Sequence, residues 1–138
     1  MSENSTELEG LQATLDKLVH HREKSKVKGL NLHAFIYFIT IRNLSGRSVT
    51  LKGRKWVLSN DDGTTTVVEG EKIVGETPVI PSGESFSYNS YHVTHLAATA
   101  SGSFHGVDEY AEKIHVRLAP FRLEIPEDLE KSEENPLS

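Results

Sequence analysis

The segment that decides the fold class is His33-Ala34-Phe35-Ile36-Tyr37-Phe38-Ile39-Thr40-Ile41-Arg42. It is rich in aromatic and β-branched residues, which favour strands, and it is apolar at both odd and even positions. Because successive side chains of a strand point to opposite faces of a sheet, this pattern predicts a strand that is buried on both faces. A turn-forming cluster of Asn, Ser and Gly follows at residues 43–48.

The next apolar segment, residues 49–58, changes its alternation part-way along. Val49 and Leu51 occupy odd positions, whereas Trp56 and Leu58 occupy even positions. Since the side-chain period of a strand is two, one extra residue must intervene, and we expect a β-bulge at Gly53. The Asn-Asp-Asp-Gly sequence that follows at residues 60–63 predicts a tight turn and a hairpin into a strand at residues 64–68.

Residues 114–125 show a similar change of parity at Ala119-Pro120. Proline cannot donate a ladder hydrogen bond, so we expect this strand to break, bulge or switch sheets there. Further strands are expected at residues 85–93 and 97–104. Several short strands separated by Gly, Pro and Asn turns, without a convincing helix between them, predict an all-β sandwich of two antiparallel sheets.

The segment before residue 21 is ambiguous. Its leucines have the spacing of an amphipathic helix, with Ser5 or Thr6 as a cap: Leu8, Leu11, Leu15 and Leu18. Its apolar residues also approximate the alternation of a strand: Leu11, Ala13, Leu15 and Val19, interrupted at Lys17. The local pattern alone leaves both structures open.

Length and composition limit the class of protein. The 138 residues have room for one domain, and the absence of cysteine excludes a disulfide framework, a cysteine–zinc site and a thiol nucleophile. The first residues lack the order of a signal peptide, and no apolar run approaches the ~20 residues of a membrane span. We therefore expect a cytoplasmic protein that makes no contact with a membrane.

The net charge of −5 is unevenly distributed. Residues 1–9 carry −3 and residues 127–138 carry −4, which leaves +2 for the part between them. We expect disordered acidic tails at residues 1–9 and 127–138 around a single domain at residues 10–126. The small charge of that domain gives no reason to expect nucleic-acid binding.

An ordered series of motifs resembles the ApaG family over residues 11–126. The series consists of Ile39-Thr40-Ile41-Arg42-Asn43-Leu44, Gly53-Arg54-Lys55-Trp56, residues 68–78, residues 81–88 with Ser90, Gly102-Ser103-Phe104, and residues 119–126. The resemblance implies an immunoglobulin-like or fibronectin type III-like sandwich. In that fold the first strand falls at residues 11–21, so the resemblance favours a strand over a helix there.

The resemblance also carries expectations about function. Similar bacterial proteins are associated with cobalt tolerance and magnesium efflux, often beside a gene for a diadenosine tetraphosphate hydrolase, and similar eukaryotic domains are treated as protein-interaction modules. We therefore expect a non-enzymatic binding module with an unidentified protein partner, no cofactor and no catalytic residues. The sequence leaves open whether the chain forms a homodimer. The alternatives are a sensor of a phosphate, a nucleotide or a divalent metal ion, and an unrecognised hydrolase.

A glycine-rich stretch is the candidate phosphate site, with Gly70, Lys72 and Gly75 as its binding residues. Glycines let backbone amides approach a phosphate, and a lysine can neutralise it. In the family this stretch has been compared with a pyrophosphate-binding loop, but Lys72 stands in place of its middle glycine. Thr77-Pro78 also makes a following helix unfavourable, so a loop whose glycines serve turns is the alternative.

Histidines and aromatic residues provide the other candidates. A hairpin could bring His92, His95 and His105 together as a metal site, with Asp108 or Glu109 completing it, although surface histidines near turns are ordinary. We assign Trp56, Phe35, Tyr37, Ile39 and Phe86 to the core, and Tyr88, Tyr91 and Phe121 to an interaction surface. The basic run at residues 22–28 lacks interleaved aromatics, so we interpret it as a solvated connector between strands.

Overall fold

The computed structural model describes residues 5–23 and 31–126, and this part of the chain contains β-strands and no α-helix. The all-β prediction is therefore confirmed. The strands are β1 (Thr6–Glu7), β2 (Leu11–Glu23), β3 (Leu32–Asn43), β4 (Val49–Asn60), β5 (Thr65–Glu71), β6 (Val79–Ile80), β7 (Ser85–Thr94), β8 (Ala98–Asp108) and β9 (Lys113–Leu123). No helix in the described residues could span a membrane.

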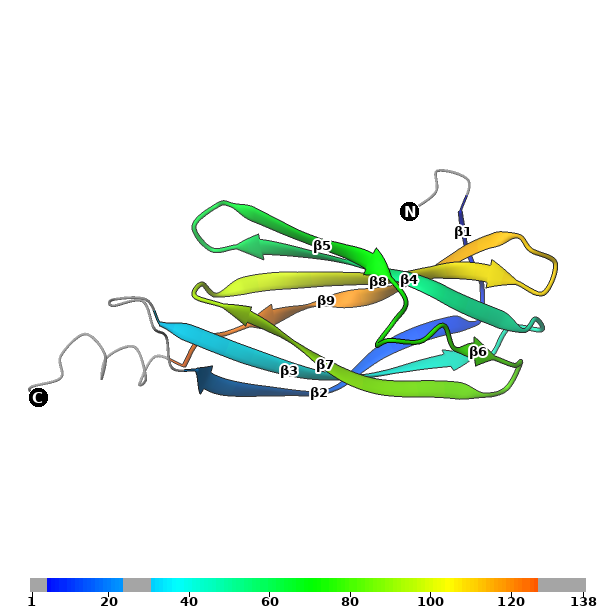
Figure 1. Ribbon diagram of the computed structural model, residues 1–138, viewed down its shortest axis with the longest axis horizontal. Helices are drawn as coiled ribbons and strands as arrows, with labels where there is room; N and C mark the ends of the chain where they lie inside the picture. Colours follow the sequence, from blue (N-terminus) through cyan, green and yellow to red (C-terminus); the bar gives the residue numbers. More distant parts are fainter. Residues whose placement is uncertain (1–4, 24–30, 127–138) are drawn as a thin grey trace, which may run out of the picture.

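The strands form one strongly curled sheet with the order β5-β4-β8-β9-β2-β3-β7. The curl places the β2–β3–β7 layer opposite the β5–β4–β8–β9 layer, so the molecule has the two facing layers of a sandwich (Figure 1). The expectation of two separate antiparallel sheets is wrong in detail. The layers are joined by a short parallel contact between β2 and β9, and β1 also pairs with β9 in parallel.

The core lies between the two layers, and it contains most of the residues assigned to it from the sequence. Trp56 and Phe35 are 1% exposed and Ile39 is fully buried. Tyr37 is buried beside them, whereas Phe86 is only partly buried at the margin of the core. The predicted burial of β3 on both faces is wrong, because Ala34 is the one outward side chain of this strand that is buried, and the others are half-buried or, at Arg42, exposed.

The bulges expected in β4 and β9 are confirmed. The register of β4 against β8 shifts between Leu51 and Gly53, which leaves Lys52 as the extra residue. The register of β9 against β8 shifts at Ala119-Pro120, yet β9 pairs with β8 on both sides of the shift and does not change sheets. The hairpin predicted after β4 is also present: β4 pairs with β5, and the Asn60 amide donates to the Thr64 carbonyl across the turn.

The ambiguous N-terminal segment is a strand, β2, and a bulge explains why its sequence resembles a helix. The register against β3 shifts between Leu15 and Lys17, so Asp16 is an extra residue. As a result Leu11, Leu15 and Leu18 all contact the core, although they are spaced by four and three residues. A bulged strand and an amphipathic helix produce the same local spacing.

The folded part begins before residue 10, so the predicted tail at residues 1–9 is wrong in its second half. Thr6 pairs with Ile114, and Ser5 is hydrogen-bonded to His115. Residues 1–4, the tail at 127–138 and most of the predicted basic connector, residues 24–28, lie outside the described residues.

Asn43, at the end of β3, holds the turn that leads to β4. Its side chain is fully buried, and its Nδ2 donates to the carbonyls of Arg47 and Ile80 over 2.7 and 2.8 Å. Its Oδ1 accepts from the backbone amide and the hydroxyl of Ser45. Asn43 therefore fixes the β3–β4 turn and anchors β6, a structural role that gives a physical reason for Asn at this position.

Candidate functional site

Exposed apolar side chains lie beside an open strand edge on the outer side of the β2–β3–β7 layer. Tyr91 and Val93 of β7 are 62% and 48% exposed. Tyr91 lies opposite Ile36 of β3, which lies opposite Val19 of β2. Ile36, Val19 and Phe38 are half-buried. We call these residues the β7 face: Val19, Ile36, Phe38, Tyr91 and Val93.

A hollow of about 390 Å³ adjoins the β7 face, where β2, β3 and β7 run side by side. Its lining includes Phe38 and, around it, the side chains of Asp16, Lys17, Ser87 and Asn89. The Lys17 ammonium lies 5.6 Å from the centre of the Phe38 ring. The hollow therefore combines an aromatic wall with carboxylate, ammonium, hydroxyl and amide groups, as binding pockets commonly do.

Strand β7 is an edge strand, and in the described part of the chain it pairs only with β3. Its sequence, Ser-Phe-Ser-Tyr-Asn-Ser-Tyr-His-Val-Thr, contains no Lys, Arg, Asp, Glu or Pro. Natural proteins usually protect exposed edges with such residues, with bulges or with short strands. The other edge strand, β5, is shorter and carries Glu69, Gly70 and Glu71. Among the described strands β7 is therefore the less protected edge.

Two of the three residues predicted for an interaction surface are not exposed. Tyr91 points outward, but Tyr88 is 9% exposed and packs edge-on against Tyr37 and Phe104. Burial raises the pKa of the Tyr88 phenol. Phe121 is partly buried, and its ring centre lies 5.9 Å from that of Trp56. Tyr88 and Phe121 therefore belong to the interior and its margin, which corrects the prediction.

The three histidines predicted to bind a metal do not come together. The expected hairpin is absent, because β7 and β8 follow one another in sequence but lie in opposite layers (Figure 1). His92 is buried between Tyr37 and Trp56, and burial lowers its pKa to about 4. His95 is exposed, and His105 lies on the outer side of the other layer. Within the described ranges no cluster of three or more metal-ligating side chains exists.

Asp108, expected to complete the metal site, is part of a turn instead. Its carboxylate is buried, accepts a hydrogen bond from Arg47 at 2.9 Å and accepts two more from the amides of Tyr110 and Glu112. The carboxylate of Glu109 accepts from the Ser48 amide. These contacts tie the β8–β9 turn to the β3–β4 turn.

The glycine-rich stretch is also explained by structure. A Cβ added at Gly70 would lie 3.0 Å from a nitrogen of the Arg54 guanidinium, and that group donates to the carbonyls of Glu71 and Lys72. Lys72 and Gly75 both have a positive φ, as tight turns require.

The amides of this stretch are largely occupied. The Lys72 amide donates to Lys52, and the Ile73 amide donates to Glu76. A phosphate cradle needs such amides to converge on a ligand. Gly70, Lys72 and Gly75 instead shape the loop that leads from β5 to β6.

A model of the ApaG domain matches residues 23–109. The chain belongs to the ApaG family. It is 39% identical over 93 residues to Protein ApaG of Vibrio cholerae, covering 67% of this chain and 74% of that protein. Protein ApaG of Pectobacterium atrosepticum is 41% identical over 93 residues, with the same coverage. Protein ApaG of Klebsiella pneumoniae is 43% identical over 94 residues, covering 68% of this chain and 70% of that protein.

Two solved structures have a fold similar to that of this chain. The X-ray structure of the Northeast Structural Genomics Consortium target SoR45 superimposes with a TM-score of 0.73 at 28% identity, covering 86% of this chain and 89% of that one. The crystal structure of a protein named ApaA from Bordetella pertussis gives a TM-score of 0.69 at 22% identity, covering 87% and 98%. The second likeness concerns the fold alone.

One contact in this ApaG chain resembles part of a catalytic site. The Ser5 hydroxyl lies 2.7 Å from His115 Nδ1. A catalytic triad also needs a carboxylate on the other imidazole nitrogen, but His115 Nε2 is buried and has no hydrogen-bond partner among the described residues. The pair fixes β1 on β9 and lacks the third group that would orient a general base.

The hollow beside Phe38 was missed by the sequence analysis. The charge-free composition of residues 85–94 was visible in the sequence, but their place at an edge depends on the pairing order. Asp16 and Lys17 reach the hollow through the bulge of β2, for which the sequence gives only an ambiguous signal.

Proposed function

We propose that this ApaG-family chain is a non-enzymatic protein-binding module that pairs an extended segment of a partner protein with the edge of β7. The observation that carries the proposal is the composition of β7, an edge strand of 10 residues without a charged residue or proline. Strand addition to an exposed sheet edge is a common mode of peptide recognition, in which backbone hydrogen bonds provide affinity.

The β7 face provides the contacts that would make the pairing selective. A strand added next to β7 presents alternate side chains to its outer side, where Tyr91 and Val93 are exposed. Tyrosine is frequent among residues that dominate binding energy, because it offers a large rigid surface with a polar end. The hollow around Phe38 lies on the same side and can accept a side chain from the partner, with Asp16 and Lys17 available for a polar group.

We also infer that the fold is a variant of the immunoglobulin-like or fibronectin type III-like sandwich. The inference is supported by the main path of seven strands in two facing layers and by the crossover from β7 to β8. The absence of cysteine supports a cytoplasmic location. An association of the chain with cobalt or magnesium homeostasis is the family-level expectation that this proposal retains.

The proposal can be tested by selecting peptides from a random library on the immobilised chain and mapping their site by NMR. We expect amide shifts along β7 and the β7 face, and tighter binding of peptides that can extend over several residues. Tyr91→Ala should weaken binding at least tenfold, which corresponds to about 1.4 kcal/mol.

Val67→Ala is the matched control, because Val67 is a 55% exposed apolar residue of the other edge strand. It should leave peptide affinity unchanged. Peptides whose shifts map away from β7, or whose affinity is the same for the unmodified chain and Tyr91→Ala, would show that this edge is not the binding site.

A further inference from the structure

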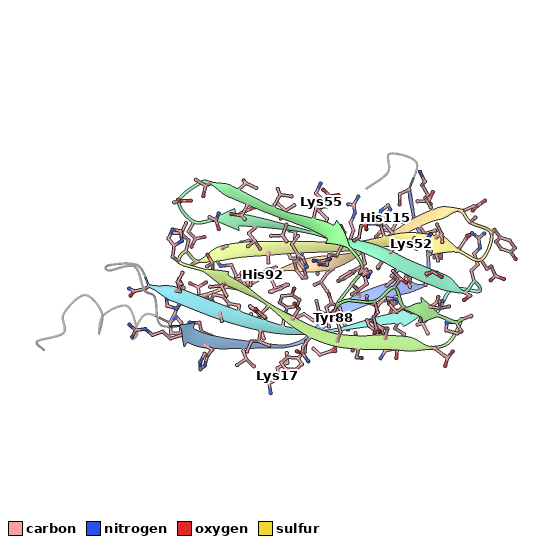
Figure 2. All side chains as sticks on the ribbon, viewed as in Figure 1. Lys17, Lys52, Lys55, Tyr88, His92 and His115 are labelled. Atoms are coloured by element: carbon pink, nitrogen blue, oxygen red, sulfur yellow. The ribbon has the colours of Figure 1, made fainter. Side chains whose placement is uncertain are left out.

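A second hollow lies on the opposite side of the molecule, on the outer surface of the β4–β8–β9 layer. It has a volume of about 240 Å³ and is lined by Ser5, Lys52, His105, Gly106, Val107, Lys113 and Ile114. Figure 2 shows Lys52 and His115 on the side of the molecule away from Lys17. Lys17 is one of the residues that line the hollow beside Phe38. This second hollow is therefore separate from the proposed partner-binding edge.

The bulge of β4 builds one wall of this hollow. Lys52 is the extra residue of the bulge, and the next residue, Gly53, has no side chain. A Cβ at Gly53 would lie 2.4 Å from His105 Nε2, so the imidazole ring lies against the β4 backbone in space that only glycine leaves open. The glycine after the bulge therefore positions His105 at the hollow.

The opposite wall comes from β9. Lys113 and Ile114 line the hollow from this strand, and β8 runs between β4 and β9. Neighbouring strands are about 5 Å apart, so the backbones that carry Lys52 and Lys113 are separated by about 10 Å. Two lysine side chains can both reach a single small group that lies above β8 between them.

The charges of the lining residues have one sign. Lys52 and Lys113 are cations, His105 can become one, and no lining residue is a carboxylate. His115 lies opposite His105 in the β8–β9 register, and His105 Nδ1 and His115 Nε2 are buried without a hydrogen-bond partner among the described residues. The carboxylate of Glu69 on β5 acts on the charge of His105 but does not line the hollow. An anion placed between the lysines would be stabilised by both.

The size of the hollow limits the ligand. A volume of about 240 Å³ equals that of roughly eight water molecules in the liquid. It accommodates a tetrahedral oxyanion with a short organic group but not a whole dinucleotide. Val107 supplies an apolar wall against which such an organic group can pack.

We propose that this hollow is a binding site for a small phosphate, either the free ion or a short phosphorylated compound, held between Lys52 and Lys113 above His105. Ser5 also lines the hollow, and its hydroxyl can donate to the phosphate in the tautomer in which His115 Nδ1 donates to Ser5. The proposal does not depend on the β7 edge, because the two sites share no residue.

The test is an NMR titration of the intact chain with inorganic phosphate, in which sodium chloride keeps the ionic strength constant. We expect saturable amide shifts at residues 52, 105–107, 113 and 114. Lys52→Gln and Lys113→Gln, which keep most of the side-chain bulk, should each weaken phosphate binding at least tenfold. Lys55→Gln is the matched control, since Lys55 lies on the same strand as Lys52 but does not line the hollow, and it should bind as the unmodified chain does.

A second readout follows the His105 ring. Burial lowers the pKa of His105 in the absence of a ligand. A bound dianion favours the imidazolium, so by linkage saturating phosphate should raise the pKa of His105. Glu69, His115 and Lys52 are among the other charged or titratable groups around it. This rise should be absent in Lys52→Gln.

Glycerol phosphate, titrated in the same way, distinguishes the two sources of the phosphate group. Tighter binding than inorganic phosphate identifies a phosphorylated compound, and weaker binding identifies the free ion. Shifts that do not saturate, that sodium chloride alone reproduces, or that persist unchanged in both lysine variants would overturn the proposal.

Discussion

His92→Phe isolates the effect of one buried histidine on stability. The imidazole is 8% exposed, its centre lies 4.9 Å from those of Tyr37 and Trp56, and its Nε2 has no hydrogen-bond partner among the described residues. Phenylalanine has a similar ring and removes that unpartnered nitrogen. We therefore expect the free energy of unfolding at pH 7 to change by less than about 1 kcal/mol.

The effect of His92 should appear in acid. Burial lowers its pKa from 6.5 to about 4 in the folded chain, so the unfolded chain binds more protons between these values. Stability is therefore lost as the pH falls from 6.5 towards 4. With 1.36 kcal/mol per unit of pKa, this histidine accounts for a loss of roughly 2 kcal/mol between pH 7 and pH 5.

Urea unfolding at pH 7 and pH 5 measures this loss. The unmodified chain should lose roughly 2 kcal/mol more than His92→Phe between the two pH values. Burial also lowers the pKa of His20, His33 and His105, but these groups are present in both proteins and cancel in the comparison. The matched control is His95→Phe, at an exposed position, which should follow the unmodified chain. Equal losses for the unmodified chain and His92→Phe would refute the reasoning.

Three further substitutions test the packing, each by urea unfolding at pH 7. Trp56→Ala should cost about 3–5 kcal/mol, because the indole is 1% exposed; a cost below about 1 kcal/mol would place it outside the core. Asn43→Ala should cost about 2–3 kcal/mol, since it removes the partner of several buried groups, whereas Asn89→Ala, at an exposed position, should cost less than about 0.5 kcal/mol. Gly106→Ala should be more destabilising than Gly53→Ala, because its Cβ would lie 1.9 Å from the Thr50 carbonyl oxygen, while at Gly53 it meets a side chain that can move.

The alternation of apolar residues predicted the strands and two of their bulges. The change of parity that marks a bulge was clear in β4 and β9, because each strand has at least two inward residues before the register shift and at least two after it. The signal was ambiguous in β2. Its bulge at Asp16 converts alternation into the spacing of Leu11, Leu15 and Leu18, which a helix would also produce.

The pairing order could not be predicted from these patterns. Residues 85–104 contain two strands with a short connection, which suggested a hairpin and therefore the cluster of His92, His95 and His105. The chain instead crosses from one layer to the other between β7 and β8. Which strands pair over a long sequence distance depends on the packing of the whole core, and local propensity does not encode it.

The outward residues were predicted only in part. The sequence analysis assigned both Tyr88 and Tyr91 to an interaction surface, although residues of opposite parity in one strand face opposite sides of the sheet. In the structure Tyr88 shares its inward side with Phe86 and His92, so Tyr91 is the exposed one. The lining of the second hollow was missed altogether, because Lys52 on β4 is far in sequence from His105 and Lys113, which lie on the β8–β9 hairpin.

Both hollows lie beside bulges, and the core does not require those bulges. If Lys52 were absent, simple alternation along β4 would still place Val49, Leu51, Trp56 and Leu58 on the same inward side. The same holds for β2 without Asp16, where Leu15 and Leu18 would remain inward. Each extra residue instead adds a side chain to the lining of a hollow, Asp16 beside Phe38 and Lys52 beside His105. Since bulges are frequent next to functional sites, where they redirect side chains, their presence in strands that could pack without them supports a binding role for both surfaces.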